Sequence, residues 1–334
     1  MNFNKKKIKI LVTLGPSSLT KDFLIFAKKK PISFLRLNMS HIKTNKLPKI
    51  IKYIRKFNTK TPICLDTEGA QIRTKISKRV YLTKGKKFKL NKKKNSLNLY
   101  PSDIYDKLKV GDILLIGFEN LEAKVTKIKS NSIELKAISA GFLEGNKGVH
   151  LKNRNIKLNY LTNKDIQAIK IAKKFKITNF ALSFTNSSED IKNFKKIIEK
   201  NNKIYKLETF NAIKNIKNIA KEGSNFLIDR GDLSKETNIE KIPMYQRKII
   251  NEIKKFKKNE IYIATNLLES MIKNNYPTRA EANDIYNCLE LGASGLVLAA
   301  ETAIGKYPKE SVNFLIKMIN EYLNFKEKKK FNIV

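Results

Sequence analysis

The sequence predicts an α/β fold in which eight parallel strands close into a TIM (β/α)8 barrel. Continuous apolar runs of strand length alternate with Lys-rich segments of helical periodicity along most of the chain. Strands that are apolar throughout are typical of a parallel sheet covered on both faces, and about eight strand–helix units close a barrel. The clearest amphipathic helices are expected over residues 165–175, 188–199 and 244–256. The expected barrel strands are residues 8–14, 34–38, 63–67, 180–184, 204–208, 226–230, 261–265 and 296–299.

One interval does not follow this alternation of strand and helix patterns. Between about residues 75 and 153, short strands with alternating polar and apolar residues are separated by turn residues. Alternation at period two is typical of strands with one solvated face. We therefore expect residues 75–153 to form a small all-β barrel lid domain after the third strand, and residues 1–74 and 154–334 to form the catalytic barrel. The strands expected in the insert are residues 80–82, 87–90, 113–116, 123–128 and 132–137.

The net charge of +39 comes mostly from lysines spread evenly along the chain. A strongly basic chain often binds nucleic acid or an anionic surface. A dedicated nucleic-acid-binding protein more often carries a localised patch of arginine interleaved with aromatic residues. We interpret the charge as compositional drift that attracts anionic metabolites, and a basic RNA-binding protein remains an alternative.

The apolar segments are too short for a membrane protein. No stretch approaches the roughly 20 apolar residues that cross a bilayer, so we expect no membrane partner. The two cysteines, Cys64 and Cys288, lie in apolar segments and form no disulfide framework. This usage predicts a reducing, cytoplasmic location.

Polar residues stand at the C-terminal ends of seven expected barrel strands. One such residue means little, because helix caps commonly fall there. In a barrel, however, these strand ends converge on the face where active sites are built. The residues are Asn38, Ser40, Asp66, Ser183, Lys206, Glu208, Asp232, Thr265 and Glu301.

Several segments with polar residues follow one another in a characteristic order. They are FLRLNMSH at 34–41, LDTEGAQIRT at 65–74, DRGDL at 229–233, ATNLLESM at 264–271 with PTRAE at 277–281, and ETAIGKYP at 301–308. In order and spacing, from about residue 7 to 322, they resemble the motifs of the pyruvate kinase family. The resemblance implies a glycolytic, ATP-binding enzyme that needs Mg²⁺ and K⁺. Its reaction would move a phosphoryl group from phosphoenolpyruvate to ADP, giving pyruvate and ATP.

The family resemblance assigns Glu208 and Asp232 to Mg²⁺, and it assigns Lys206 to stabilising the phosphoryl group and the enolate. Carboxylates are the hard oxygen ligands that Mg²⁺ prefers. Lys206 stands two residues before Glu208, so both side chains point to the same side of one strand. The structural alternative is two carboxylates paired with nearby lysines.

Potassium ligands are also implied by the resemblance. They are Asn38, Ser40, Asp66 and the carbonyl of Thr67. Without the resemblance, Asn38 and Ser40 would be interpreted as loop or cap residues.

Substrate and nucleotide contacts complete the implied site. Arg36 and Arg73 match the family's phosphate-facing arginines, and arginine supplies a planar bidentate donor. Thr265 matches the threonine beside the enolate carbon, where the family delivers a proton, and Glu301 lies on the acid–base side.

The backbone N–H groups of Gly231 and Asp232 open onto a helix and are expected to hold the substrate carboxylate. The nucleotide is expected at His41, Arg73 and Lys147.

Departures from the family cluster at the nucleotide end. Gly117 and Phe118 stand where the family's lid has paired aspartates and a glycine. Ala299 and Ala300 replace a serine and a glycine, and Gln71 replaces a glutamate that correlates with potassium dependence. The alternative is therefore a catalytically reduced barrel that binds phosphoenolpyruvate or enolpyruvate without efficient ADP turnover.

The chain stops near the last expected barrel helix, so we expect the family's C-terminal regulatory domain, and activation by sugar phosphates, to be absent. A homo-oligomer through barrel contacts remains possible, because residues 279–291 are present.

Overall fold

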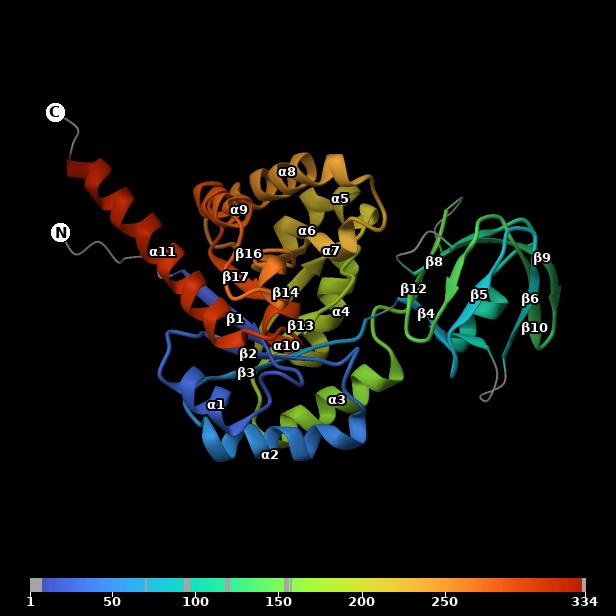
Figure 1. The fold of residues 1–334 in the computed structure, drawn as a ribbon, viewed down its shortest axis with the longest axis horizontal. Coiled ribbons are helices and arrows are strands. Elements are labelled where there is room, and N and C mark those ends of the chain that lie inside the picture. Colours follow the sequence, from blue (N-terminus) through green and yellow to red (C-terminus); the bar gives the residue numbers. More distant parts are fainter. Residues whose placement is uncertain are drawn as a thin grey trace. The chain divides into compact units, whose positions relative to one another are not determined.

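The computed structural model describes residues 8–69, 71–92, 97–117, 121–152, 156 and 158–331. The chain divides into two compact units, Met1–Glu68 with Asn163–Val334, and Gly69–Thr162. The first unit is an α/β barrel and the second is an all-β unit (Figure 1).

Eight parallel strands close the first unit, which confirms the predicted TIM barrel. Their order around the barrel is β1-β17-β16-β15-β14-β13-β3-β2. Each strand expected from the sequence is present, with its ends displaced by no more than about two residues. The bounds are β1 Lys9–Thr13, β2 Phe34–Asn38, β3 Ile63–Asp66, β13 Asn179–Leu182, β14 Asn202–Leu207, β15 Asn225–Asp229, β16 Glu260–Ala264 and β17 Gly295–Leu298.

Helices surround these strands (Figure 1). The three helices expected from the sequence correspond to α3, α4 and α8, and each ends one or two residues before the predicted end. The start of α4 is fixed by a capping box, in which Ser187 accepts the Asp190 N–H and Asp190 accepts the Ser187 N–H. The bounds are α1 Lys21–Lys28, α2 Leu47–Phe57, α3 Asn163–Lys174, α4 Ser188–Ile198, α5 Phe210–Lys214, α6 Ile216–Glu222, α7 Arg230–Leu233, α8 Ile242–Lys254, α9 Arg279–Glu290, α10 Ala300–Ala303 and α11 Pro308–Phe331.

Among the residues that the structure describes, every helix is too short or too polar to cross a lipid bilayer.

The inside of the barrel is filled by apolar side chains. Strands on all sides contribute buried side chains to this layer. This packing supports the strand ends where the polar residues lie. The layer consists of Leu11, Cys64, Ala181, Ile204, Leu227, Tyr262, Ala264 and Val297, with Phe34 packed against it.

The second unit is built from short antiparallel strands. A seven-stranded sheet has the order β6-β10-β9-β8-β12-β4-β7, and β11 pairs with β5. Five strands match the sequence prediction, whereas β4, β7, β11 and β12 were not predicted because these short runs include polar residues or glycine and show no clear period. The bounds are β4 Ile72–Lys75, β5 Val80–Leu82, β6 Lys87–Asn91, β7 Asn98–Tyr100, β8 Ile113–Ile116, β9 Leu121–Lys129, β10 Ser132–Ala137, β11 Gly141–Leu143 and β12 Gly148–Leu151.

We expect Ile204→Ala to lower the free energy of unfolding by about 3 kcal/mol, because it opens a cavity in the barrel interior. Ile204 is 5% exposed, whereas Ile239 is 78% exposed. Ile239→Ala is therefore the matched control and should change stability by less than about 0.5 kcal/mol. Urea unfolding followed by circular dichroism measures both, and equal effects would contradict the packing described.

Candidate active site

The polar residues of the site continue the inward-facing columns of the barrel interior. Successive side chains of a strand point to opposite faces, so residues two apart share a face. Ile204 lies in the interior layer, and Lys206 follows it on β14. In the same way Cys64 precedes Asp66 on β3, and Leu227 precedes Asp229 on β15. The C-terminal layer of the barrel is therefore polar where the layer beneath it is apolar.

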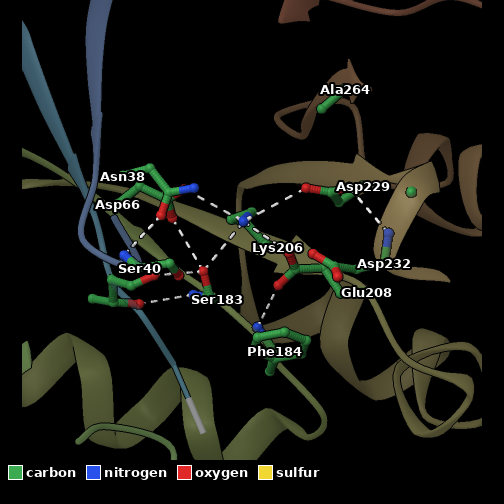
Figure 2. Close-up of polar contacts among 12 residues, drawn as sticks. Asn38, Ser40, Asp66, Ser183, Phe184, Lys206, Glu208, Asp229, Asp232 and Ala264 are labelled. Carbon is green, nitrogen blue, oxygen red and sulfur yellow. Dashed lines mark hydrogen bonds and ion pairs between the residues drawn. The ribbon is translucent and has the colours of Figure 1, made fainter. Parts of the chain in front are cut away.

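Lys206 lies at the centre of a buried ion cluster (Figure 2). Its Nζ is 2.7 Å from Glu208 Oε1, 3.4 Å from Asp66 Oδ2 and 3.7 Å from Asp229 Oδ2. It also donates a hydrogen bond of 3.2 Å to Ser183 Oγ. Lys206 is 4% exposed, and unpaired burial of its ammonium would cost several kcal/mol. The three carboxylates offset that cost.

Arg36 is held by the same cluster. Its Nε donates to Asp66 Oδ2 at 2.7 Å, its second guanidinium nitrogen pairs with that oxygen, and its Nη1 donates to Thr13 Oγ1 at 2.9 Å. Arg36 is 4% exposed. Burial by itself would lower the pKa of Arg36, but the neighbouring carboxylates, first of all Asp66, raise it above its ordinary value. The guanidinium therefore stays charged.

The two members of the Lys206–Glu208 pair have pKa values displaced in the same direction. Burial lowers the pKa of Lys206, but Asp66 and Glu208 outweigh burial and hold it above its ordinary value. An ion pair usually lowers the pKa of its acid. Here burial raises the pKa of Glu208 to about 8, because Asp229, Asp232 and Asp66 oppose the effect of Lys206. The cluster has more negative charge than its lysine can balance.

Three carboxylates offer oxygen atoms to a single point. Ligand atoms of Glu208, Asp229 and Asp232 lie within 4.8 Å of one another. Glu208 Oε2 accepts the Phe184 N–H at 2.6 Å, whereas the buried Oε1 touches Lys206 without the alignment of a hydrogen bond. Hard oxygen donors with excess negative charge fit Mg²⁺. The predicted ligands Glu208 and Asp232 are thus brought together.

The residues predicted to hold a monovalent cation also lie close to one another (Figure 2). Asn38 is paired with Asp66 across β2 and β3, and Asn38 Oδ1 accepts the Ser40 N–H at 3.0 Å. The Ser183 hydroxyl is 3.2 Å from Asp66 Oδ1 and donates to the Thr67 carbonyl at 2.8 Å. Ser183 therefore joins this group of oxygens to Lys206.

Thr265 follows β16 in an unusual backbone conformation. Thr265 and Asn266 have φ values of 69° and 56°, which are costly for residues other than glycine. Arg230 offsets that cost by donating to the Thr265 carbonyl at 3.2 and 2.7 Å. Its Nη1 also bonds both carboxylate oxygens of Asp284 at 2.9 and 2.7 Å, so Arg230 anchors this turn to α9.

The backbone donors expected to bind a substrate carboxylate are occupied by side chains of this chain. The Gly231 N–H donates to Thr265 Oγ1 at 2.8 Å, and the Asp232 N–H donates to Asp229 Oδ1 at 3.3 Å. Asp229 is thus the N-cap of α7, while Asp232 pairs with Lys235. A substrate carboxylate would have to share these donors.

Glu301 lies elsewhere at the same end of the barrel. Its Oε1 accepts the Leu268 N–H at 3.2 Å, and its Oε2 accepts the Ala299 N–H at 2.7 Å. The carboxylate therefore fixes the segments after β16 and β17. His41 is exposed in the turn after β2, where its N–H donates to the Asn38 carbonyl.

The remaining predicted residues belong to the β unit. Arg73 lies on β4, opposite Gly148 of β12 and Tyr100 of β7. Lys147 forms a 2.8 Å ion pair with Glu144. Gln71 and Gly117 lie in the same unit, whereas Phe118 is outside the described residues. The cluster around Lys206 is built from barrel residues.

Three residues of this site had no assigned role in the sequence analysis. Asp229 and Ser183 could have been found from strand periodicity, because each stands two residues after an inward-facing residue of β15 or β13. Arg230 carries no such signal, because its partners Thr265 and Asp284 are distant in sequence.

The fold and the site define a TIM-barrel protein with an inserted β unit and a buried lysine–carboxylate cluster at the C-terminal ends of its strands. The family model described as "Pyruvate kinase, barrel domain" matches residues 5–312. The chain belongs to the pyruvate kinase family.

Relatives from distant organisms support this assignment. The chain is 35% identical over 325 residues to pyruvate kinase of Methanocaldococcus jannaschii, covering 94% of this chain and 69% of the relative. It is 31% identical over 333 residues to pyruvate kinase of Thermotoga maritima, covering 95% and 71%. The match to plastidial pyruvate kinase 3 of Arabidopsis thaliana is 30% identical, and it covers 94% of this chain but only 57% of that relative's length.

Solved structures give the same result. The crystal structure of pyruvate kinase from Cryptosporidium parvum superposes with a TM-score of 0.86 at 28% identity. The match covers 95% of this chain and 70% of that chain.

In the metal-free protein, Glu208→Gln should remove one source of pH dependence in the free energy of unfolding. The folded-state pKa of Glu208, about 8, exceeds its ordinary value of 4.5, so the folded protein holds this proton more tightly than the unfolded chain. That stabilisation is fully present below about pH 4.5 and is lost as the pH rises through about 8. Measured by urea unfolding, the stability of the wild type relative to the variant should fall by roughly 4 kcal/mol between about pH 5 and pH 9. A difference independent of pH would contradict the raised pKa.

Proposed function

We propose that this protein is an active pyruvate kinase, which transfers a phosphoryl group from phosphoenolpyruvate to ADP and yields pyruvate and ATP. The observation that carries the proposal is the buried Lys206 ammonium, 2.7 Å from Glu208 and at the C-terminal end of the barrel. In this family, such a cluster provides fixed charge where phosphoryl transfer requires it.

The reaction breaks the bond between phosphorus and the enol oxygen and forms a bond from phosphorus to a terminal oxygen of ADP. The electron pair of the broken bond stays on the enol oxygen as an enolate. Protonation of the enolate at its terminal carbon then gives pyruvate. Negative charge therefore moves from the phosphoryl group to the enolate oxygen during the reaction.

Lys206 faces this shifting charge, and its carboxylate partners keep it protonated and in place. Arg36 binds a phosphoryl oxygen. Thr265 orients the proton donor for the enolate carbon from the turn that Arg230 anchors. Because these groups are held before the substrate arrives, little reorganisation is needed in the transition state.

Two cations complete the proposal. A divalent cation bound by Glu208 and Asp232 would neutralise charge on the phosphoryl and enolate oxygens. Asn38, Ser40, Asp66 and the Thr67 carbonyl would hold K⁺, with Ser183 linking this group to Lys206. The donor chemistry supports both assignments, since every ligand is an oxygen.

The nucleotide side rests on His41, Arg73 and Lys147. Gly117, Gln71, Ala299 and Ala300 depart from the family pattern there. A barrel that binds phosphoenolpyruvate but turns over ADP poorly is therefore the second candidate. The two buried free cysteines suit the reducing cytoplasm that we propose as the location.

We expect Lys206→Met to lower kcat by roughly 1,000-fold or more, because it removes charge stabilisation that is strongest in the transition state. Pyruvate formation from phosphoenolpyruvate and ADP is followed in a coupled assay with Mg²⁺ and K⁺. Lys196→Met, at an exposed position of α4, is the matched control and should keep wild-type kcat.

Circular dichroism must first establish that the Lys206→Met variant is folded. Wild-type activity in a folded variant would refute the role of Lys206. Absence of wild-type turnover, together with a melting temperature raised by phosphoenolpyruvate and not by ADP, would instead favour the second candidate.

Ser40→Ala should raise the K⁺ concentration that gives half-maximal activity by about tenfold, because it removes one oxygen ligand of a weakly held cation. Titration of KCl at constant ionic strength measures this value. Ser188→Ala, at the start of α4, serves as the control and should leave the value unchanged. Equal K⁺ requirements in all three proteins would exclude Ser40 as a ligand.

A further inference from the structure

The carboxylate group at the barrel end has a third member that the family-based assignment leaves out. Glu208, Asp229 and Asp232 offer oxygens within 4.8 Å of one another, and Asp229 is 4% exposed. We propose that Asp229 is a third protein ligand of the divalent cation, so that this site holds the cation before any substrate binds. The proposal deepens the proposed function, because it concerns the same metal site.

The position of Asp229 follows from strand register. On the parallel pair β14–β15, Leu207 lies opposite Ile228, so the next residues, Glu208 and Asp229, emerge side by side. Asp232 returns to the same point from the first turn of α7. Three carboxylates from adjacent segments thus converge without any rearrangement of the backbone.

The two oxygens of Asp229 have different surroundings. Oδ1 accepts the Asp232 N–H at 3.3 Å and lies 3.2 Å from Thr265 Oγ1, which is a structural role as an N-cap. Oδ2 instead faces the cluster, 3.7 Å from Lys206 Nζ. One oxygen therefore fixes the side chain, and the other is directed to the charges.

One carboxylate oxygen of this group is buried and accepts no hydrogen bond. Glu208 is 1% exposed, and its Oε1 makes no hydrogen bond although it touches Lys206. A buried carboxylate oxygen without a hydrogen bond is costly, and a metal ion would satisfy it. Lys206, together with the Lys235 that pairs with Asp232, provides two positive charges against the three carboxylates of the group, so the group keeps an excess of negative charge that a bound cation would reduce.

Mn²⁺ binding measured without substrate tests the proposal. We expect the wild-type protein to bind one Mn²⁺ in the absence of phosphoenolpyruvate, as detected by isothermal titration calorimetry and by electron paramagnetic resonance of the free ion. Asp229→Asn should raise the Kd for Mn²⁺ by about tenfold, because it removes one charged ligand. Asparagine keeps the Oδ1 acceptor and is as good an N-cap as aspartate, so the α7 cap is preserved.

Asp190→Asn is the matched control. Asp190 also accepts backbone N–H groups at the start of a helix, but it belongs to α4 and lies outside the carboxylate group. This variant should bind Mn²⁺ with wild-type affinity.

Wild-type Mn²⁺ affinity in a folded Asp229→Asn protein would overturn the proposal and leave Asp229 as an N-cap alone. If that variant does not fold, the wild type still decides the matter, because a requirement for phosphoenolpyruvate before Mn²⁺ can bind would equally overturn it. The Mn²⁺ binding measurements do not depend on catalytic turnover. Loss of Mn²⁺ affinity in Asp229→Asn would therefore uphold the ligand even in a protein without kinase activity.

Discussion

The site depends on one ammonium group kept charged inside the barrel. Lys206 is buried, and carboxylate oxygens of Asp66, Glu208 and Asp229 lie between 2.7 and 3.7 Å from it. The lysine could not remain charged there without its carboxylate neighbours, since an isolated buried charge costs several kcal/mol. Their mutual attraction is strong because water is excluded, so the cluster is fixed before a substrate arrives.

Barrel geometry provides the exclusion of water. The apolar layer that includes Ile204 and Leu227 closes the interior directly beneath the cluster. Strands β2, β3, β13, β14 and β15 each place a polar residue two positions further on, namely Arg36, Asp66, Ser183, Lys206 and Asp229, so a polar layer follows the apolar one along the barrel axis. The same strands thus produce both the stability of the unit and the low-dielectric surroundings that raise the pKa of Glu208, whereas the pKa of Lys206 is raised by its carboxylate neighbours against the effect of burial.

Charge is unevenly distributed in this layer. Arg36 and Asp66 form a tight pair, and Lys206 reaches from this pair to the acids of β14 and β15. The side with Asp66 is balanced, whereas the side with Glu208 has surplus negative charge. A divalent cation fits the side with Glu208 for that reason. Ser183 contacts both Lys206 and Asp66, and Asp66 is among the oxygen ligands proposed for K⁺.

The barrel strands were predictable because each is buried on both faces and therefore reads as an unbroken apolar run. The short strands β4 and β12 of the second unit were not predictable, since four residues with mixed burial show no clear period. The shared location of Lys206 and Glu208 was predictable because they stand two residues apart at the end of β14, whereas their roles came from the family resemblance.

What the sequence by itself determined was the identity of the barrel strands, the face that their side chains take, and the family to which its motifs belong. Only the tertiary structure decided that Asp229 stands beside Glu208, that Ser183 bridges Asp66 and Lys206, and that Arg230 holds the turn at Thr265. The physical reason is the register of neighbouring strands, which decides which residues lie opposite one another. The alignment of Leu207 with Ile228 is set by how crossover helices pack against the sheet, and no local pattern of residues encodes that alignment.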